Sequence, residues 1–155
     1  MPDYFQTFRN IELSLLYYLE TNLNTDWPGT TVIKTFKDAY HRDTSLPIVC
    51  VRLDDTASRK REVGSTTLDH EHLLIVDLFA KSAGQRLDMA NYITDKLALG
   101  WVHYDHSNAS GGTLDRTANG RDMVTSFITN QRLDVGESVD TKDKFRHQIS
   151  IRVRT

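Results

Sequence analysis

The sequence predicts an α+β fold, in which a largely antiparallel sheet carries two packed helices in the order α-β-β-β-α-β-β-β. Two stretches place apolar residues at helical spacing, and residues 145–154 alternate apolar and polar side chains as a half-buried strand does. The 155 residues have the length of one ordinary domain and show neither a repeat nor a linker. We therefore expect one domain over residues 1–155.

The first helix is expected near the N-terminus, where apolar residues recur every three or four positions. Asp3 and Gln6 have the spacing of a capping box, and the segment Asn-Thr-Asp-Trp-Pro-Gly at 24–29 is typical of a helix end. The expected apolar face consists of Phe5, Phe8, Ile11, Leu15, Leu16, Leu19 and Leu23.

Three strands are expected next, at residues 31–36, 46–53 and 71–80. The third is apolar on both faces, which predicts a central strand covered on each side, and Asp77 within it needs a partner. Residues 54–67 are polar and charged, and we interpret them as either a mobile loop or an extended hairpin arm.

A second helix is expected after Ser82, since Ser82 and Gln85 have capping-box spacing and Gly100 is a typical stop. Its expected core face consists of Leu87, Ala90, Ile93, Thr94 and Leu97. Strands are then expected at 101–104, 122–133 and 145–154. Residues 105–120 are interpreted as a long mobile loop, and residues 134–143 as a turn-rich connection.

Composition narrows the class of protein. The net charge of −2 and the pI near 6.3 argue against a surface built as a whole to bind nucleic acid. A single cysteine excludes a disulfide framework and a cysteine-cluster zinc site. No apolar run approaches the roughly 20 residues of a membrane span, and the N-terminus lacks the plan of a signal peptide. We expect a soluble protein from a reducing compartment.

Two histidine clusters, at 69–72 and 103–106, contain side chains that can bind metals. Neither cluster matches a known metal-binding motif, so we interpret them as polar ends of strands. A metal-dependent hydrolase that uses His70, His72, Asp105 and His106 remains an alternative. Cys50 lies within an apolar strand, which is typical of a packing thiol. We assign no catalytic residue, metal ligand or cofactor.

Basic residues gather in two places, Arg59-Lys60-Arg61 in the charged segment and Arg146, Arg152 and Arg154 on one face of the last strand. Such residues often belong to a solvated loop or a half-exposed sheet face. They also suit a contact with another subunit or with a polyanion, and a nucleic-acid-binding module is a second alternative. We take these six residues as candidate interface residues.

The order of elements resembles the tail terminator, or tail completion, proteins of long-tailed bacteriophages. The likeness covers nearly the whole chain and is carried by four features. These are the opening amphipathic helix, the strand at 46–53 before a charged arm, the strand at 71–80 that leads into the helix at 82–99, and the closing basic strand at 145–154. Head-completion and minor tail proteins share this pattern.

The resemblance implies a structural virion protein at the head–tail junction, without enzymatic activity, cofactor or membrane contact. Such proteins form rings, usually hexamers, that end polymerisation of the tail tube and provide the surface for head joining. The implied partners are other copies of the chain, the tail tube protein and the head completion or connector protein. Genomic DNA passes through the lumen without sequence-specific binding, which a near-neutral protein suits.

Overall fold

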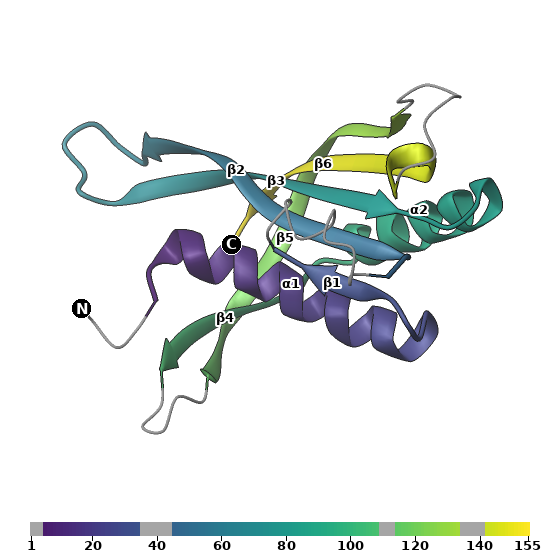
Figure 1. The fold of residues 1–155 in the computed structure, drawn as a ribbon. Coiled ribbons are helices and arrows are strands. Elements are labelled where there is room, and N and C mark those ends of the chain that lie inside the picture. The colour runs from purple at the N-terminus through teal and green to yellow at the C-terminus, as the bar shows by residue number, and fades with distance from the viewer. Residues whose placement is uncertain (1–4, 35–44, 109–113, 134–141) are drawn as a thin grey trace.

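The computed structural model describes residues 5–34, 45–108, 114–133 and 142–155. Two helices and six strands follow one another in the expected order (Figure 1). The elements are α1 (Thr7–Asp26), β1 (Thr31–Ile33), β2 (Ile48–Lys60), β3 (Leu68–Phe79), α2 (Ala83–Ala98), β4 (Trp101–Asn108), β5 (Leu114–Leu133), the 3-10 turn η2 (Lys142–Phe145) and β6 (Arg146–Arg154).

The strands form a single mixed sheet in the order β1-β2-β3-β6-β5-β4. Among the described strands, β1 pairs with β2 in parallel and every other pairing is antiparallel, so the largely antiparallel sheet of the prediction is confirmed. β3 lies between β2 and β6, and both faces of its second half are buried, from Leu74 to Phe79. The expectation of a covered central strand is therefore also confirmed.

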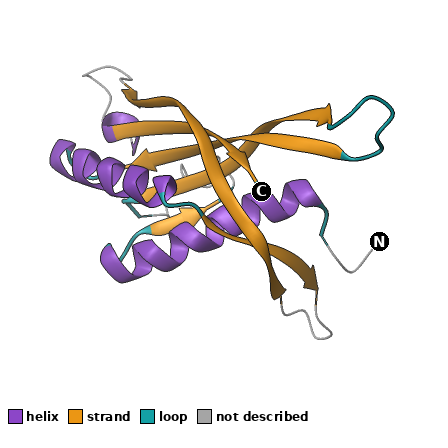
Figure 2. Ribbon diagram, turned by 180° about the vertical axis from the view of Figure 1, so that it is seen from behind, coloured by secondary structure: helices purple, strands orange, loops and turns teal. Residues whose placement is uncertain are grey.

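Both helices pack on the same face of the twisted sheet (Figure 2). Ile11, Leu15 and Leu19 of α1 and Ile93 of α2 share one apolar core with the inward side chains of the sheet, such as Val76. A smaller cluster of Ile48, Cys50 and Phe79 covers the opposite face of the sheet. No helix among the described residues has the length and apolar content needed to cross a bilayer.

The helix ends follow the sequence signals at three of four positions. Ser82 caps α2 by accepting a 3.1 Å hydrogen bond from the Gln85 amide, as the capping-box spacing predicts. Gly100 ends α2 with a φ of +71°, and α1 ends at Asp26. The predicted capping box of α1 is wrong, because the N-cap residue is Gln6 and its side chain forms no capping hydrogen bond.

The expected helix faces need two corrections. Leu87 is 62% exposed, because the buried face of α2 runs through Arg86, Met89, Ala90, Ile93 and Leu97. Phe8 is also largely exposed, although its ring covers part of the site described below.

The segment 54–67 forms a hairpin arm rather than a loop, because β2 continues to Lys60 and β3 begins at Leu68 (Figure 1). The hairpin alternative for 54–67 is thus confirmed, whereas the expected loop at 105–120 is wrong for its described part: residues 105–108 and 114–120 are paired strands of a second hairpin. Within the expected connection at 134–143, residues 134–141 lie outside the described part of the chain.

Candidate functional site

The described residues enclose a groove of about 430 Å³, which we call the arm groove. It lies where the β2–β3 arm, the start of α1, the β4–β5 hairpin and the C-terminal residues approach one another. Its polar lining consists of Thr7, Arg61, Asp69, His70, His72, His103, Asp105, Asn119, Arg154 and Thr155. The groove therefore unites both histidine clusters with parts of both basic groups.

His70 and His72 follow one another on the helix-facing side of β3. Hydroxyl groups of β2 hold them from the neighbouring strand, with Ser58 Oγ 2.8 Å from His70 Nδ1 and Thr56 Oγ1 2.9 Å from His72 Nδ1. The ring of Phe8 packs edge-on against both imidazoles. Burial, followed by the nearby charge of His70, lowers the pKa of His72, so its ring is neutral at pH 7.

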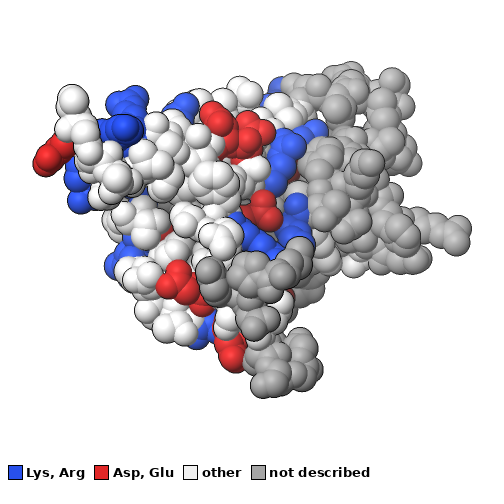
Figure 3. All heavy atoms as spheres, turned by 90° about the vertical axis from the view of Figure 1, so that its left-hand side faces the viewer, with Lys and Arg blue, Asp and Glu red and all other residues white. Residues whose placement is uncertain are grey.

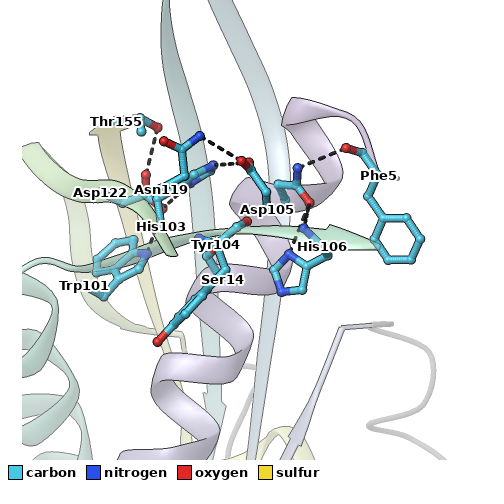
Figure 4. Close-up of polar contacts among 11 residues, drawn as sticks. Phe5, Ser14, Trp101, His103, Tyr104, Asp105, His106, Asn119, Asp122 and Thr155 are labelled. Carbon is cyan, nitrogen blue, oxygen red and sulfur yellow. Dashed lines mark hydrogen bonds and ion pairs between the residues drawn. The ribbon is translucent and has the colours of Figure 1, made fainter. Parts of the chain in front are cut away.

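Asp122 is the buried centre of a hydrogen-bonded cluster beside this groove (Figure 4). Its carboxylate receives the Trp101 indole N–H at 3.1 Å and the Thr155 hydroxyl at 2.8 Å. His103 Nδ1 lies 3.1 Å from the same carboxylate. Burial lowers the pKa of His103, but the hydrogen bond and charge of Asp122 outweigh it, so the net shift is upward.

His103 and His106 contact different elements, as expected from their odd spacing on a strand. His106 turns away from the arm groove toward α1, where its Nδ1 lies 3.1 Å from Asn10 Oδ1 (Figure 4). The ligand set of the hydrolase alternative is therefore not assembled: His70, His72 and Asp105 line the groove, but His103 takes the place of His106. Among the described residues, no three His, Cys, Asp or Glu side chains could hold a metal ion together.

The exposed basic residues at the groove have acidic neighbours. Arg61 forms a 2.8 Å ion pair with Asp69, which lowers the pKa of that carboxyl through their hydrogen bond. Arg154 Nε lies 3.7 Å from Glu71 Oε1. Arg59, Lys60, Arg61 and Arg154 all line a smaller groove of about 210 Å³ on the arm. The structure thus brings four of the six candidate interface residues together.

The other two candidates lie elsewhere. Arg146 has only 13% of its side chain exposed and donates a 2.8 Å hydrogen bond to Asp77, whose carboxylate is wholly buried. Arg146 is thus the partner that Asp77 needs, together with Gln148 at 3.3 Å and Arg52 at 3.7 Å. Arg152 is half-buried on the same strand. The last strand therefore presents fewer free cations than its sequence suggests.

Charges of both signs are interspersed on the face of the molecule that carries the arm (Figure 3). The described residues visible on this face form no continuous basic stripe of the kind that binds a nucleic-acid backbone. The geometry of this face thus gives the nucleic-acid alternative no support.

Cys50 is buried, and burial followed by the Asp77 charge raises its pKa to about 11, so it remains a protonated thiol at neutral pH.

Sequence reasoning missed Asp122 and Trp101 as parts of one cluster. The available signal was an acidic residue directly before Met123 and Val124 of an expected strand, just as Asp77 lies among apolar residues of its own strand. No protein-family model matches the chain, and no curated protein matches it.

Proposed function

We propose that the protein is a structural virion protein that caps the head-proximal end of a phage tail tube as a closed ring. In this role it ends polymerisation of the tube and provides the surface to which the filled head joins. Copies of the chain, the tail tube protein and a head completion or connector protein are the proposed partners. DNA passes through the lumen without sequence-specific contacts.

The observation that carries the proposal is the open edge of β5. β4 pairs with β5 only as far as Asp122, and no described strand continues that pairing along residues 123–133. Met123, Phe127 and Ile128 expose apolar surface on this segment. An exposed apolar strand edge favours pairing with another chain, and a closed ring satisfies every such edge by a repeated contact.

Two further features support an assembly role. The β2–β3 arm and the β4–β5 hairpin project beyond the packed core in different directions, which suits contacts on several sides (Figure 1). Two register shifts interrupt the pairing of β5 with β6 at Val124/Ser126 and Phe127/Thr129. Such bulges bend an edge strand and restrict the partners with which it pairs.

Deletion of the protein from the virus tests this function directly. We expect tails of uncontrolled length that fail to join heads, while heads still fill with DNA. Electron micrographs give tail lengths, and the packaged DNA is quantified separately. Tails of normal length that join heads in the absence of the protein would refute the proposal.

A second experiment examines the arm as part of the joining surface. Reversal of charge at Arg59, Lys60 and Arg61 to Glu should reduce head joining and change the thermal midpoint of the purified protein little, because all three side chains are exposed and an exposed ion pair such as Arg61–Asp69 contributes little to stability. The control reverses three exposed lysines distant from the arm, Lys34, Lys81 and Lys144. If both triple variants impair joining equally, net charge rather than the arm is responsible.

A further inference from the structure

Another groove, which we call the aromatic groove, lies between α1 and the start of β4 and has a volume of about 410 Å³. Its lining includes Tyr17 and Tyr18 of α1, Trp101 and Tyr104 of β4, and Leu99. Tyr18 stacks on Trp101 with 5.8 Å between the ring centres, and Tyr17 packs edge-on against Tyr104 at 5.6 Å. These ring contacts within one chain preform the groove.

The chemistry of the aromatic groove suits a protein partner. Tyrosine, tryptophan and arginine are the residue types that contribute most at the centre of protein interfaces. Leu99 is 64% exposed at the rim, and Tyr17 and Tyr104 are only half-buried. Arg121 also lines the groove, and its bond to the Leu99 backbone oxygen at 3.1 Å uses one of its five N–H groups.

The charge of the aromatic groove selects the kind of partner. Arg121 lies in the lining, and the Arg116 guanidinium lies 4.1 Å from the centre of the Tyr17 ring. None of the described residues that line the groove is acidic. The groove therefore favours a segment that combines an apolar side chain with a negative charge.

The tip of the β2–β3 arm has this combination. The tip is a turn in which the Ser65 amide donates a 3.1 Å hydrogen bond to the Glu62 carbonyl oxygen. Val63 follows Glu62 in this turn and is fully exposed. Turns are usually built from Gly, Pro, Asn, Asp and Ser, so a fully exposed valine beside an exposed glutamate marks this tip as a contact surface.

Glu62 is available for a contact with another chain. Arg61, the residue before it, is already paired with Asp69 at 2.8 Å, and no basic side chain among the described residues pairs with Glu62. Arg59 and Lys60 lie farther from the tip on the same strand. The charge next to Val63 is therefore negative.

The arm tip and the aromatic groove lie at opposite ends of the molecule. The arm projects beyond the N-terminal end of α1, whereas Tyr17 and Tyr18 lie in the second half of that helix (Figure 1). The two surfaces do not overlap, so a tip in a groove joins copies head to tail. Contacts of this type close into a ring when the rotation between copies allows it.

We propose that the arm tip of one copy docks in the aromatic groove of a second copy. Val63 contacts the aromatic rings there, and Glu62 pairs with Arg121. The inference rests on the proposed function, because it names the contact that joins neighbouring subunits of the ring. Each copy uses its arm tip toward one neighbour and its groove toward the other.

Sedimentation of the purified full chain over a range of concentrations tests the role of Val63. Val63→Asp should raise the dissociation constant at least about tenfold, because it places a second charge against the aromatic rings. The control Leu87→Asp, at an exposed leucine of α2 outside the groove, should leave association unchanged. The proposal is overturned if the parent protein remains monomeric at about 1 mM, or if the two variants associate equally well.

An exchange of charges tests the pairing of Glu62 with Arg121. Glu62→Arg and Arg121→Glu should each weaken association by about three- to tenfold, and the double variant should recover most of the loss. Both side chains are exposed, so the thermal midpoints should stay close to that of the parent protein. A double variant that associates no better than either single variant contradicts this pairing.

Cross-linking identifies the two surfaces directly. A copy with Val63→Cys and a copy with Leu99→Cys should be joined by a short bis-maleimide, whereas a copy with Leu87→Cys in place of the second should not. Cys50 is buried and does not compete for the reagent. Equal yields from both mixtures would overturn the proposed contact.

The same variants separate this contact from the proposed function. If loss of the protein disturbs tail length but Val63→Asp still assembles as the parent does, the contact is wrong and the capping function stands. If tails are normal without the protein, the capping function is wrong whatever the contact between copies.

Discussion

Arg146 of β6 donates a hydrogen bond to Asp77 of β3 across 2.8 Å, and the Asp77 carboxylate has no exposed surface. The central carbon of the Arg146 guanidinium lies 5.3 Å from the centre of the Phe79 ring. Arg146 therefore stabilises the face of the sheet opposite the helices, and its charge is already neutralised. Besides Asp77, the sheet buries a second carboxylate, that of Asp122.

Replacement of Arg146 by Met should destabilise the protein by about 3–5 kcal/mol, because it leaves the buried Asp77 carboxylate with the neutral amide of Gln148 at 3.3 Å and the more distant Arg52 at 3.7 Å. The double variant Asp77→Asn/Arg146→Met should be more stable than Arg146→Met alone, since it removes the isolated charge. Urea denaturation measures both free energies of unfolding. Arg154→Met, at a more exposed ion pair, should cost less than about 1 kcal/mol.

The contribution of His103 to stability should depend on pH. Its pKa is raised in the folded protein above the ordinary value of 6.5 by the hydrogen bond and charge of Asp122, against the effect of burial. The stabilisation is therefore complete below pH 6.5 and is lost as the pH rises through the folded pKa. Urea denaturation at a series of pH values above 6.5 should show this loss in the parent protein. His103→Gln should flatten the curve, and an equal slope in the variant would contradict the assignment.

Gly100→Ala should be much more destabilising than Gly29→Ala, although both glycines have positive φ values. A Cβ at position 100 would lie 2.8 Å from the backbone oxygen of Asp122 and 2.5 Å from the Met123 sulfur, whereas position 29 has open space. The strain of φ alone is about 1–2 kcal/mol, and we expect that value for Gly29→Ala. Thermal or urea unfolding of the two variants measures the difference, and equal losses would show that the close approach at Gly100 relaxes freely.

Leu74→Ala should reduce the free energy of unfolding by about 2–4 kcal/mol, because Leu74 is wholly buried in the main core. Leu87→Ala should change it by less than about 0.5 kcal/mol, since Leu87 is exposed. Urea denaturation measures both changes. A large loss at Leu87 would show that α2 buries the face expected from its sequence rather than the face through Arg86.

The elements that the sequence predicted correctly are those that short-range signals define. Ser82 and Gln85 mark a helix start through one local hydrogen bond, and the alternation at 145–154 marks a strand through its own pleat. The hairpin at 105–120 was missed because polar residues such as Asp115 and Arg116 are exposed along β5. A strand that buries neither face has the composition of a loop.

The arm groove could not be predicted for a different reason. It combines His72, His103 and Thr155, which are distant in the sequence, and their proximity depends on strand pairings and sheet twist. The basic face of the last strand was interpreted from charge alone, whereas Arg146 is paired with Asp77 inside the fold. Whether a charged side chain is free depends on its neighbours, and those become visible only in three dimensions.

The β2–β3 arm can vary in length without any change to the core. The arm is formed by the paired residues from Asp55 to Lys60 and from Leu68 to Leu73, of which His70 and His72 contact Phe8 of α1, and the connecting turn makes its own local contacts. Two residues added to each strand would lengthen the arm by about 7 Å and keep every side chain on its present face, whereas one residue would reverse the faces. Homologous chains that differ mainly here would keep one scaffold and span different gaps between neighbouring parts of a particle.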